Sequence, residues 1–379
     1  MSRRVLVISY HFPPSPGVAS MRLGNLVRHL PEHGWEADVL AGPTLEVADG
    51  TLAEGIALHR VERVEPRAHA PRIQSLDWAL AAARPARRLA RDADVVLISG
   101  GPFAPFALGP LLGRRYVLDF RDPWSWEPRF GRLDSRARRK LGLAVERRGE
   151  ALAVRHAAGV VTVSPQITET YRRMYPPLGD RIETLRHGWE PADVPHRANE
   201  AAVPPELVYA GTFMPGERTP ALLVETAHRV RESGIPLHVR LLGRIPDELR
   251  PLTSAAEAEG WLTVEGPVPH RTAVAALHRA AAIWSQPGDL PFLITGKIYE
   301  CLASGRPVVA VAPQGGALAE LIAETGGAIV AAEDPEACAA AVREALAGDA
   351  PALRHDVIEN LAAPAVAGRL ASILQRAAG

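Results

Sequence analysis

The chain of 379 residues contains little lysine and little cysteine. Its only lysines are Lys140 and Lys297, whereas arginine is abundant, a bias that we attribute to genome composition. Two cysteines, Cys301 and Cys338, are too few for a disulfide scaffold or a cysteine-rich metal site, so we expect two small core residues. The 43 basic residues balance the 43 acidic residues, which argues against a nucleic-acid binder.

Long apolar runs are also missing. No stretch is long enough to cross a bilayer, and the apolar residues after Met1 lack a signal-peptide cleavage site, so we expect a cytoplasmic protein. The sequence has no G-x-G-x-x-G, so the fingerprint of nicotinamide dinucleotide binding is absent. It also has no D-x-D in a plausible site position, the motif that would indicate a metal ion. We therefore expect neither a cofactor nor a metal ion.

What the sequence does contain is an alternation of short apolar runs with helical patterns. The runs predict strands at residues 4–9, 36–41, 95–99, 116–120 and 159–164, and again at 207–211, 238–243, 262–266, 282–286 and 307–312. The helical patterns cover residues 20–33, 76–91, 136–156, 220–233, 272–281 and 366–377. A polar, proline-rich stretch separates the two series. This order predicts an α/β fold with two doubly wound, Rossmann-like domains, whose ligands bind beyond the carboxyl ends of the strands in an interdomain cleft.

The segment ITGKIYE places a lysine and a glutamate at a strand–helix junction. Thr295 and Gly296 precede a predicted helix, whose first free N–H groups would hold a diphosphate. Lys297 lies where the helix dipole disfavours a cation, so its presence indicates an anionic partner. Glu300 shares the face of Lys297 and can accept both hydroxyls of a ribose. The alternative is a Lys297–Glu300 surface pair, which we favour less because the helix is otherwise apolar.

Two other loops follow predicted strands. After residues 207–211, Gly211 and Thr212 allow close backbone approach, and Arg218 could hold a phosphate through its planar guanidinium. The alternative is a solvated arginine at a loop tip. Between residues 9 and 22, Gly17 precedes a helix start that favours negative charge, and a proline-stiffened connection explains this loop equally well.

The segment LDFRDPWSWEPRF combines charges with aromatic rings at the end of a strand. Asp119, Arg121 and Asp122 are followed by Trp124 and Trp126, a combination that suits a polar substrate such as a sugar. A packed tryptophan loop stabilised by an Arg–Asp pair is nearly as good an interpretation.

Two remaining features receive less weight. The arginine-dense residues 129–148 could contact anionic lipid headgroups, but their apolar face is short and a solvated helix is the favoured alternative. His11 and His187 could both reach the predicted cleft, although a single histidine is more often structural.

Taken together, these segments resemble the retaining GT-B glycosyltransferases of the GT4-like class, in particular the bacterial branch that builds capsules and O-antigens. The resemblance covers nearly the whole chain and is carried, in order, by VISYHFPPSPGVASMR, LDFRDPWSWEP, VERRGEALAVRHAAGVVTVSPQITETY, RHGWEPADV, YAGTF…ER, VEGPVPH and GKIYECLASGRPVV. In the fourth segment His187 and Glu190 stand where the family has asparagine and aspartate.

The resemblance implies an acceptor-binding domain at residues 1–190, a linker at 191–205 and a nucleotide-sugar-binding domain at 206–362. It also implies a C-terminal helix at 363–379 that packs back on the first domain. The implied donor is a nucleotide-diphosphate sugar, and the implied acceptor is a glycan, a lipid-linked molecule or a small molecule. We expect no nucleic-acid partner, and at most weak contact with the inner face of a membrane.

The resemblance also assigns roles to single residues. Glu300 matches the glutamate that binds ribose hydroxyls, and Arg218 matches the basic residue that meets the diphosphate, with Lys297 assisting. The remaining implied donor contacts are Gly211, Thr212, Arg244, Val268, Thr295 and Gly296. The acceptor would lie near Gly17, Asp122 and Trp124.

The sequence departs from the family pattern at two places. Phe292 occupies the position of an earlier glutamate, and residues 98–105 lack the histidine that many members carry near the reacting sugar. With no evident nucleophile, the implied mechanism is front-face displacement, in which Arg218 and Lys297 neutralise the leaving diphosphate. The alternatives are a GT-B sugar-nucleotide epimerase and a non-catalytic partner protein that binds a sugar nucleotide.

Overall fold

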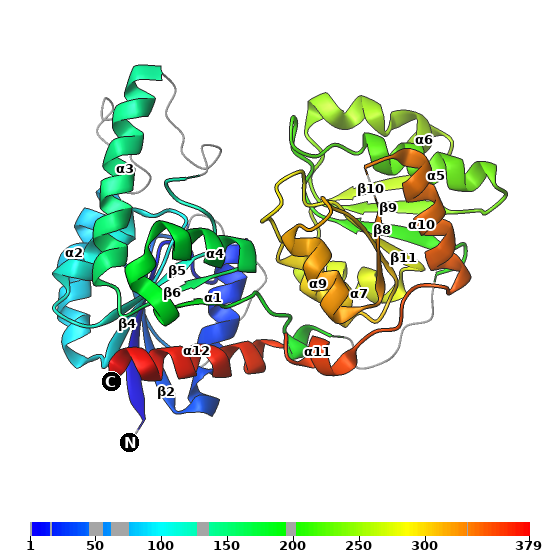
Figure 1. The fold of residues 1–379 in the computed structure, drawn as a ribbon. Coiled ribbons are helices and arrows are strands. Elements are labelled where there is room, and N and C mark those ends of the chain that lie inside the picture. The colour runs from blue at the N-terminus through cyan, green and yellow to red at the C-terminus, as the bar shows by residue number, and fades with distance from the viewer. Residues whose placement is uncertain are drawn as a thin grey trace. The chain divides into compact units, whose positions relative to one another are not determined.

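The structure is a computed structural model that describes residues 2–15, 17–44, 56–61, 76–126, 136–194, 202–331 and 333–379. The chain forms two compact units, each built around one parallel sheet. Unit 1 comprises Met1–His187 together with Ala363–Gly379, and unit 2 comprises Gly188–Ala362 (Figure 1). The prediction of an α/β fold with two doubly wound sheets is confirmed.

Among its described residues, unit 1 has a seven-stranded sheet in the order β3-β2-β1-β4-β5-β6-β7. The strands are β1 (Arg3–Ser9), β2 (Trp35–Ala41), β3 (Ala57–Arg60), β4 (Val95–Ser99), β5 (Tyr116–Phe120), β6 (Gly159–Thr162) and β7 (Ile182–Thr184). The helices include α1 (Val18–His29), α2 (Leu76–Leu89), η3 (Ala104–Leu111), α3 (Arg136–His156), α4 (Pro165–Met174) and α12 (Ala363–Ala378). The order of the strands reverses between β1 and β4, and their carboxyl ends therefore mark the position where doubly wound sheets bind ligands.

The core of unit 1 combines residues from both ends of the chain. Val5 and Val7 of β1 are completely buried because helices cover both faces of the sheet. Helix α12 packs against α1 and contributes Leu370 and Leu374 to the same apolar cluster. The last residues of the chain are therefore part of the first folding unit.

Unit 2 has, in its described part, a six-stranded sheet in the order β10-β9-β8-β11-β12-β13. The strands are β8 (Glu206–Ala210), β9 (His238–Leu242), β10 (Leu262–Gly266), β11 (Ala282–Ser285), β12 (Val308–Val311) and β13 (Ala328–Ala331). The helices include α5 (Ala221–Glu232), α7 (His270–Arg279), α8 (Lys297–Ala303), α9 (Ala317–Thr325), α10 (Pro335–Ala347) and α11 (His355–Glu359), with the short 3-10 helix η5 (Pro191–Asp193) near the start of the unit. Here the order reverses between β8 and β11.

The structure adds strands that the sequence analysis did not predict. Strands β3 (ALHR) and β7 (IET) contain few apolar residues, so neither presents an apolar run. Strand β13 (AIVA) is as apolar as β12 (VVAV), and the sequence analysis overlooked it. Helix α7 begins at His270, two residues before the predicted start, which places this histidine in its first turn. Cys301 and Cys338 are buried and unbonded, as predicted. In the described ranges, no helix combines the length and the apolar character that a membrane crossing requires.

Candidate active site

Glycines line part of the carboxyl edge of the sheet in unit 2. Gly211 follows β8, Gly243 follows β9 and Gly266 ends β10, and the Gly243 N–H donates to the Gly266 carbonyl at 2.7 Å. The backbone of Gly243 has a φ of 136°, and a Cβ there would lie 2.0 Å from the Gly211 carbonyl oxygen. No side chain fits at this position, because the loops after β8 and β9 pack backbone against backbone here.

Arg218 connects two loops at this edge. Its Nε donates to the Thr212 carbonyl at 2.8 Å, and its Nη1 donates to the Pro287 carbonyl at 2.9 Å. Thr212 follows β8 and Pro287 follows β11, so the arginine bridges the loops beside the reversal of strand order. It is half-buried rather than a solvated residue at a loop tip. A guanidinium has five N–H donors, which leaves capacity for an anion as well.

Glu300 is paired with a histidine rather than with Lys297. The Nε2 atom of His270 lies 3.5 Å from Oε1 of Glu300 and 3.2 Å from Oδ2 of Asp193. Asp193 ends η5, and the first turns of α7 and α8 supply the other two residues. Among the described residues, no ion pair joins Lys297 to Glu300, so the surface-pair alternative is not what forms.

The carboxylate of Glu300 is incompletely satisfied by the protein. One side-chain oxygen faces His270, while Oε2 is enclosed and has no hydrogen-bond partner in the described structure. Burial raises the pKa of Glu300, with Asp193 adding to the effect and His270 and Lys297 opposing it. The side chain keeps 16% of its surface exposed, although Oε2 itself is covered.

His270 is the histidine partner of the two carboxylates in this group. Burial acts to lower its pKa, but the hydrogen bond with Asp193 and the charges of Glu300 and Asp193 outweigh burial and the repulsion from Lys297. The pKa of His270 is therefore raised, and the imidazolium form is favoured next to the two carboxylates.

The other predicted donor contacts lie nearby with different exposure. Arg244 is exposed, and its backbone carbonyl accepts a hydrogen bond from the Phe213 N–H at 3.1 Å. Val268 is half-buried and packs on the core, whereas Thr295 and Gly296 are half-buried at the start of α8. Phe292, which replaces the family's earlier glutamate, is 7% exposed and belongs to the buried apolar residues.

Unit 1 contains a buried polar cluster at its own reversal of strand order. Arg22 of α1 forms an ion pair of 2.6 Å with Asp119 at the end of β5, and Ser99 of β4 donates to the same carboxylate at 2.8 Å. A second Arg22 nitrogen donates to the Leu185 carbonyl at 3.0 Å. The ion pair therefore ties α1, β4, β5 and the end of β7 together.

Arg121 and Asp122 lie next to this cluster. Arg121 donates to the carbonyls of Gly100 and Gly101, and to Oγ of Ser99 at 3.2 Å. Burial raises the pKa of Asp122, with Arg121 opposing and Asp119 adding to the shift. An Asp–Arg pair does stabilise this region, but its arginine is Arg22, 97 residues away from Asp119 in the sequence.

Two histidines complete the polar surroundings of Arg121. Burial and the charge of Arg121 lower the pKa of His11. Burial and the charges of Arg22 and Arg121 hold the pKa of His187 well below its usual range. Both imidazoles are therefore neutral near pH 7, a form that can accept a hydrogen bond or a proton.

The remaining predicted acceptor residues have clear structural roles. Gly17 precedes α1 with a φ of 110°, and a Cβ there would meet no other atom within 4 Å. Trp124 stacks on Phe103 with ring centres 5.3 Å apart, and the backbone N–H of Trp124 donates to Oη of Tyr171 at 3.2 Å. The packed-loop alternative accounts for these contacts of Trp124.

Comparison with known families assigns both units. Residues 17–188 match the model described as "Glycosyl transferase 4-like domain", and residues 204–348 match "Glycosyl transferases group 1". The two matches together span most of the chain. The chain is a GT-B, GT4-like glycosyltransferase.

Solved structures with the same fold include other sugar-handling enzymes. Sucrose-phosphate synthase from Thermosynechococcus elongatus superposes with a TM-score of 0.68 at 17% identity, covering 98% of each chain. WaaG, a glycosyltransferase involved in lipopolysaccharide biosynthesis, has a TM-score of 0.66 at 13% identity, with 97% of this glycosyltransferase and 95% of WaaG covered. UDP-GlcNAc 2-epimerase from Methanocaldococcus jannaschii has a TM-score of 0.63 at 10% identity, with 98% and 99% covered. None of the curated proteins compared with the glycosyltransferase matches its sequence.

Sequence reasoning did not single out several residues that the structure brings into these groups. His270 is the last residue of VEGPVPH and stands two residues before the start of the predicted helix 272–281. A helix predicted to begin at His270, as α7 does, would have placed this histidine in the first turn and so at the site. Asp193, Arg22 and Ser99 carry no comparable signal, because their partners are distant in sequence.

Proposed function

We propose that this glycosyltransferase moves a sugar from a nucleotide-diphosphate sugar, held by unit 2, to a hydroxyl group of an acceptor held by unit 1. The observation that carries the proposal is the partly buried carboxylate of Glu300, one oxygen of which has no hydrogen-bond partner among the described residues. This carboxylate lies at the carboxyl edge of the sheet, beside Lys297 and with hydrogen-bonding capacity that the protein leaves unused. A ribose supplies two hydroxyl donors, and the diphosphate supplies the anion that the position of Lys297 calls for.

The proposed chemistry is front-face displacement with retention of anomeric configuration. The acceptor oxygen forms a bond to the anomeric carbon while the bond to the diphosphate oxygen breaks, and the leaving diphosphate takes the proton of the acceptor hydroxyl. Arg218 and Lys297 neutralise the charge that grows on the diphosphate. Gly211, Thr212 and Gly296 contribute close backbone approach, Arg244 offers a further cationic contact, and Val268 lines the base.

On the acceptor side, the proposal draws on the cluster around Asp122. Arg121, Asp122 and the neutral His11 offer donors and acceptors to sugar hydroxyls beside Gly17. Trp124 would shape the site through its packed position rather than by a free ring face. A cytoplasmic location and membership of the capsule and O-antigen branch are further parts of the proposal. The first is expected from the apolar pattern of the sequence, and the second rests on the sequence resemblance.

The proposal is tested by calorimetric titration of the purified protein with UDP- and GDP-sugars. The Glu300→Gln variant should bind the donor about tenfold more weakly, because one charge-assisted hydrogen bond is worth roughly 1.5 kcal/mol or more. Glu344→Gln, an exposed residue on α10 of the same unit, is the matched control and should bind like the unmodified protein. Equal donor affinity in both variants would contradict the role of Glu300.

The fold similarity to UDP-GlcNAc 2-epimerase makes epimerisation the second candidate. Incubating each bound sugar nucleotide without an acceptor distinguishes the two activities, because only an epimerase alters the sugar under those conditions. With an acceptor present, nuclear magnetic resonance of the product reports whether the anomeric configuration is retained.

A further inference from the structure

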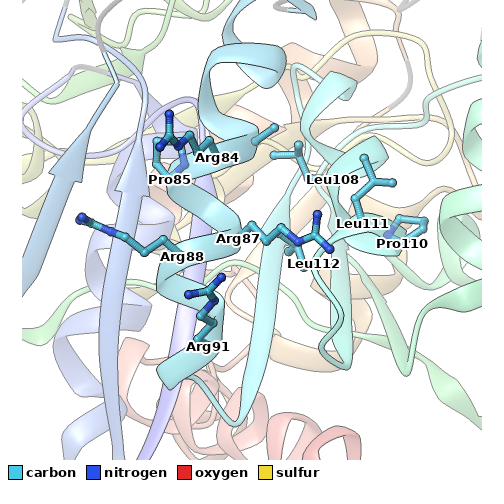
Figure 2. A pocket seen from close by; sticks show the side chains of 10 residues that line it. Arg84, Pro85, Arg87, Arg88, Arg91, Leu108, Pro110, Leu111 and Leu112 are labelled. Atoms are coloured by element: carbon cyan, nitrogen blue, oxygen red, sulfur yellow. The ribbon is translucent and has the colours of Figure 1, made fainter.

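Unit 1 has a surface hollow on helix α2. It is an open groove of about 1060 Å³ between the carboxyl-terminal half of α2 and the residues around η3. Figure 2 shows arginines on the α2 side and leucine and proline side chains on the other side. Neither the donor contacts nor the polar cluster at Asp119 includes any residue of this groove.

The charged wall of the groove follows from helical spacing. Arg84, Arg87, Arg88 and Arg91 stand at positions i, i+3, i+4 and i+7, which a helix brings onto one face. All four are exposed, and within the described ranges none forms an ion pair with a carboxylate. Four cationic groups therefore share one surface without an internal counterion.

The opposite wall of the groove is apolar, and Leu111 of η3 is its exposed part, with 62% of its surface accessible. Leu108 and Leu112 also line this wall but are only 4% and 5% exposed. On the arginine side, Leu80 precedes Arg84 by one turn of α2, so it continues the same helix face, and it is 69% exposed. Single exposed leucines are ordinary, but these two lie next to the arginines, so the surface combines cationic with apolar side chains.

We propose that this groove, formed by α2 and η3, docks the glycosyltransferase on a membrane that contains anionic phospholipids. Phosphate headgroups would pair with the arginines, and Leu80 and Leu111 would enter the interface between headgroups and acyl chains. The arginine side supplies the charge complementarity, and the leucine side supplies the apolar contact that a free phosphate ion lacks.

A nucleic acid is the less suitable partner for this surface. The chain has no basic excess, and the groove offers leucine and proline rather than aromatic rings on which bases could stack. The proposed surface also differs from the arginine-dense residues 129–148, of which 129–135 lie outside the described residues. It does not depend on the identity of the sugar donor.

The test uses the full chain and co-sedimentation with vesicles. Binding is expected to vesicles of phosphatidylcholine and phosphatidylglycerol in equal parts, to fall as salt is added, and to be absent with phosphatidylcholine alone. The Arg84→Gln/Arg87→Gln variant should bind about thirtyfold more weakly than the unmodified protein, at about 1 kcal/mol for each arginine. Leu80→Ser/Leu111→Ser should weaken the binding that remains at high salt.

The matched control removes the same charge elsewhere on unit 1. The control variant, Arg172→Gln/Arg173→Gln, replaces two exposed arginines of α4, and it should retain most of the vesicle binding. The proposal is overturned if the groove variant and this control bind alike, or if neutral vesicles bind equally well. Release by inorganic phosphate, at an ionic strength where chloride releases nothing, would identify a free-anion site instead. Equal affinity for duplex RNA would identify a nucleic-acid surface.

Discussion

At the scale of single residues, the arrangement of Asp193, His270 and Glu300 decides how the predicted ribose-binding group is charged. Two carboxylates lie within 3.5 Å of one imidazole nitrogen, so protonated His270 offsets the cost of keeping them ionised in a partly buried place. Lys297 reaches the same group as a second cation, and Arg271 approaches Asp193 at 3.9 Å. The local charge thus depends on the protonation of one histidine.

We predict that His270→Gln removes a pH-dependent part of the stability of unit 2. The raised pKa of His270 means that its contribution is fully present below its ordinary pKa of about 6.5 and is lost as the pH rises through the raised value. At a pH below about 6.5, His270→Gln should lower the free energy of unfolding of unit 2 by roughly 1.5 kcal/mol, the value of a hydrogen bond to a charged group. Amide hydrogen exchange of β8 and β11 as a function of pH measures this loss.

The control for this prediction is a histidine in an exposed pair. His228 lies 3.5 Å from Glu232 on α5, with both side chains more than half exposed. His228→Gln should change exchange in unit 2 very little, because exposed pairs contribute little. Matching pH profiles for the two variants would show that the contact of His270 with the carboxylates is energetically unimportant.

At the scale of elements, helix α3 holds the loop that follows β5 through one buried carboxylate. Glu150 is 0% exposed and accepts from the Ser125 N–H at 2.9 Å, Ser125 Oγ at 3.0 Å, Tyr171 Oη at 3.1 Å and Tyr175 Oη at 2.7 Å. These donors belong to the loop with Trp124 and to the region of α4. The carboxylate therefore fixes that loop against α3 and α4.

We predict that Glu150→Gln loosens this loop. An amide has one acceptor oxygen in place of two and adds two N–H donors, so some of the four donors lose their partner at a cost of about 3 kcal/mol. Near-ultraviolet circular dichroism reports on Trp124 and Trp126, and its signal should weaken. Glu146→Gln, one turn earlier on α3, is the control, and it should be neutral or slightly stabilising because Glu146 and Glu150 repel each other. An unchanged spectrum in Glu150→Gln would contradict this role.

At the scale of the whole molecule, the two units differ in how they are assembled from the sequence. Unit 2 is one continuous segment, whereas unit 1 takes α12 from the far end of the chain. Leu374 of α12 is completely buried with Val5 and Leu97 in the core of unit 1. The stability of unit 1 thus depends on residues that follow unit 2 in the sequence.

We predict that Leu374→Ala and Leu321→Ala destabilise different units. Both leucines are 0% exposed, so each truncation should cost about 3 kcal/mol. Leu374→Ala should speed amide exchange in β1 and β4, while Leu321→Ala on α9 should speed it in β8 and β12. Faster exchange in the same strands for both variants would refute the division of the cores.

The sequence predicted the central strands well because both their faces are buried. Strand β5 matches its predicted bounds, and β1 and β4 differ by at most one residue. The edge strands β3 and β7 were not predicted because short strands with few apolar residues leave little pattern, whereas β13, which is as apolar as β12, was overlooked. Site chemistry was harder: the pairing of Glu300 with His270, and of Asp119 with Arg22, arises only from tertiary packing. No local spacing encodes such distant partners.

The bridge between Trp189 and Ala362 has a consequence for how this protein can be rebuilt. The Trp189 N–H donates to the Leu361 carbonyl at 3.1 Å, so the chain enters and leaves unit 2 at neighbouring points. Unit 2 is in effect an inserted domain, because unit 1 includes residues on both sides of it. Joining His187 to Ala363 through a short glycine loop should yield unit 1 alone, and another domain whose two ends lie close together could be inserted in place of unit 2.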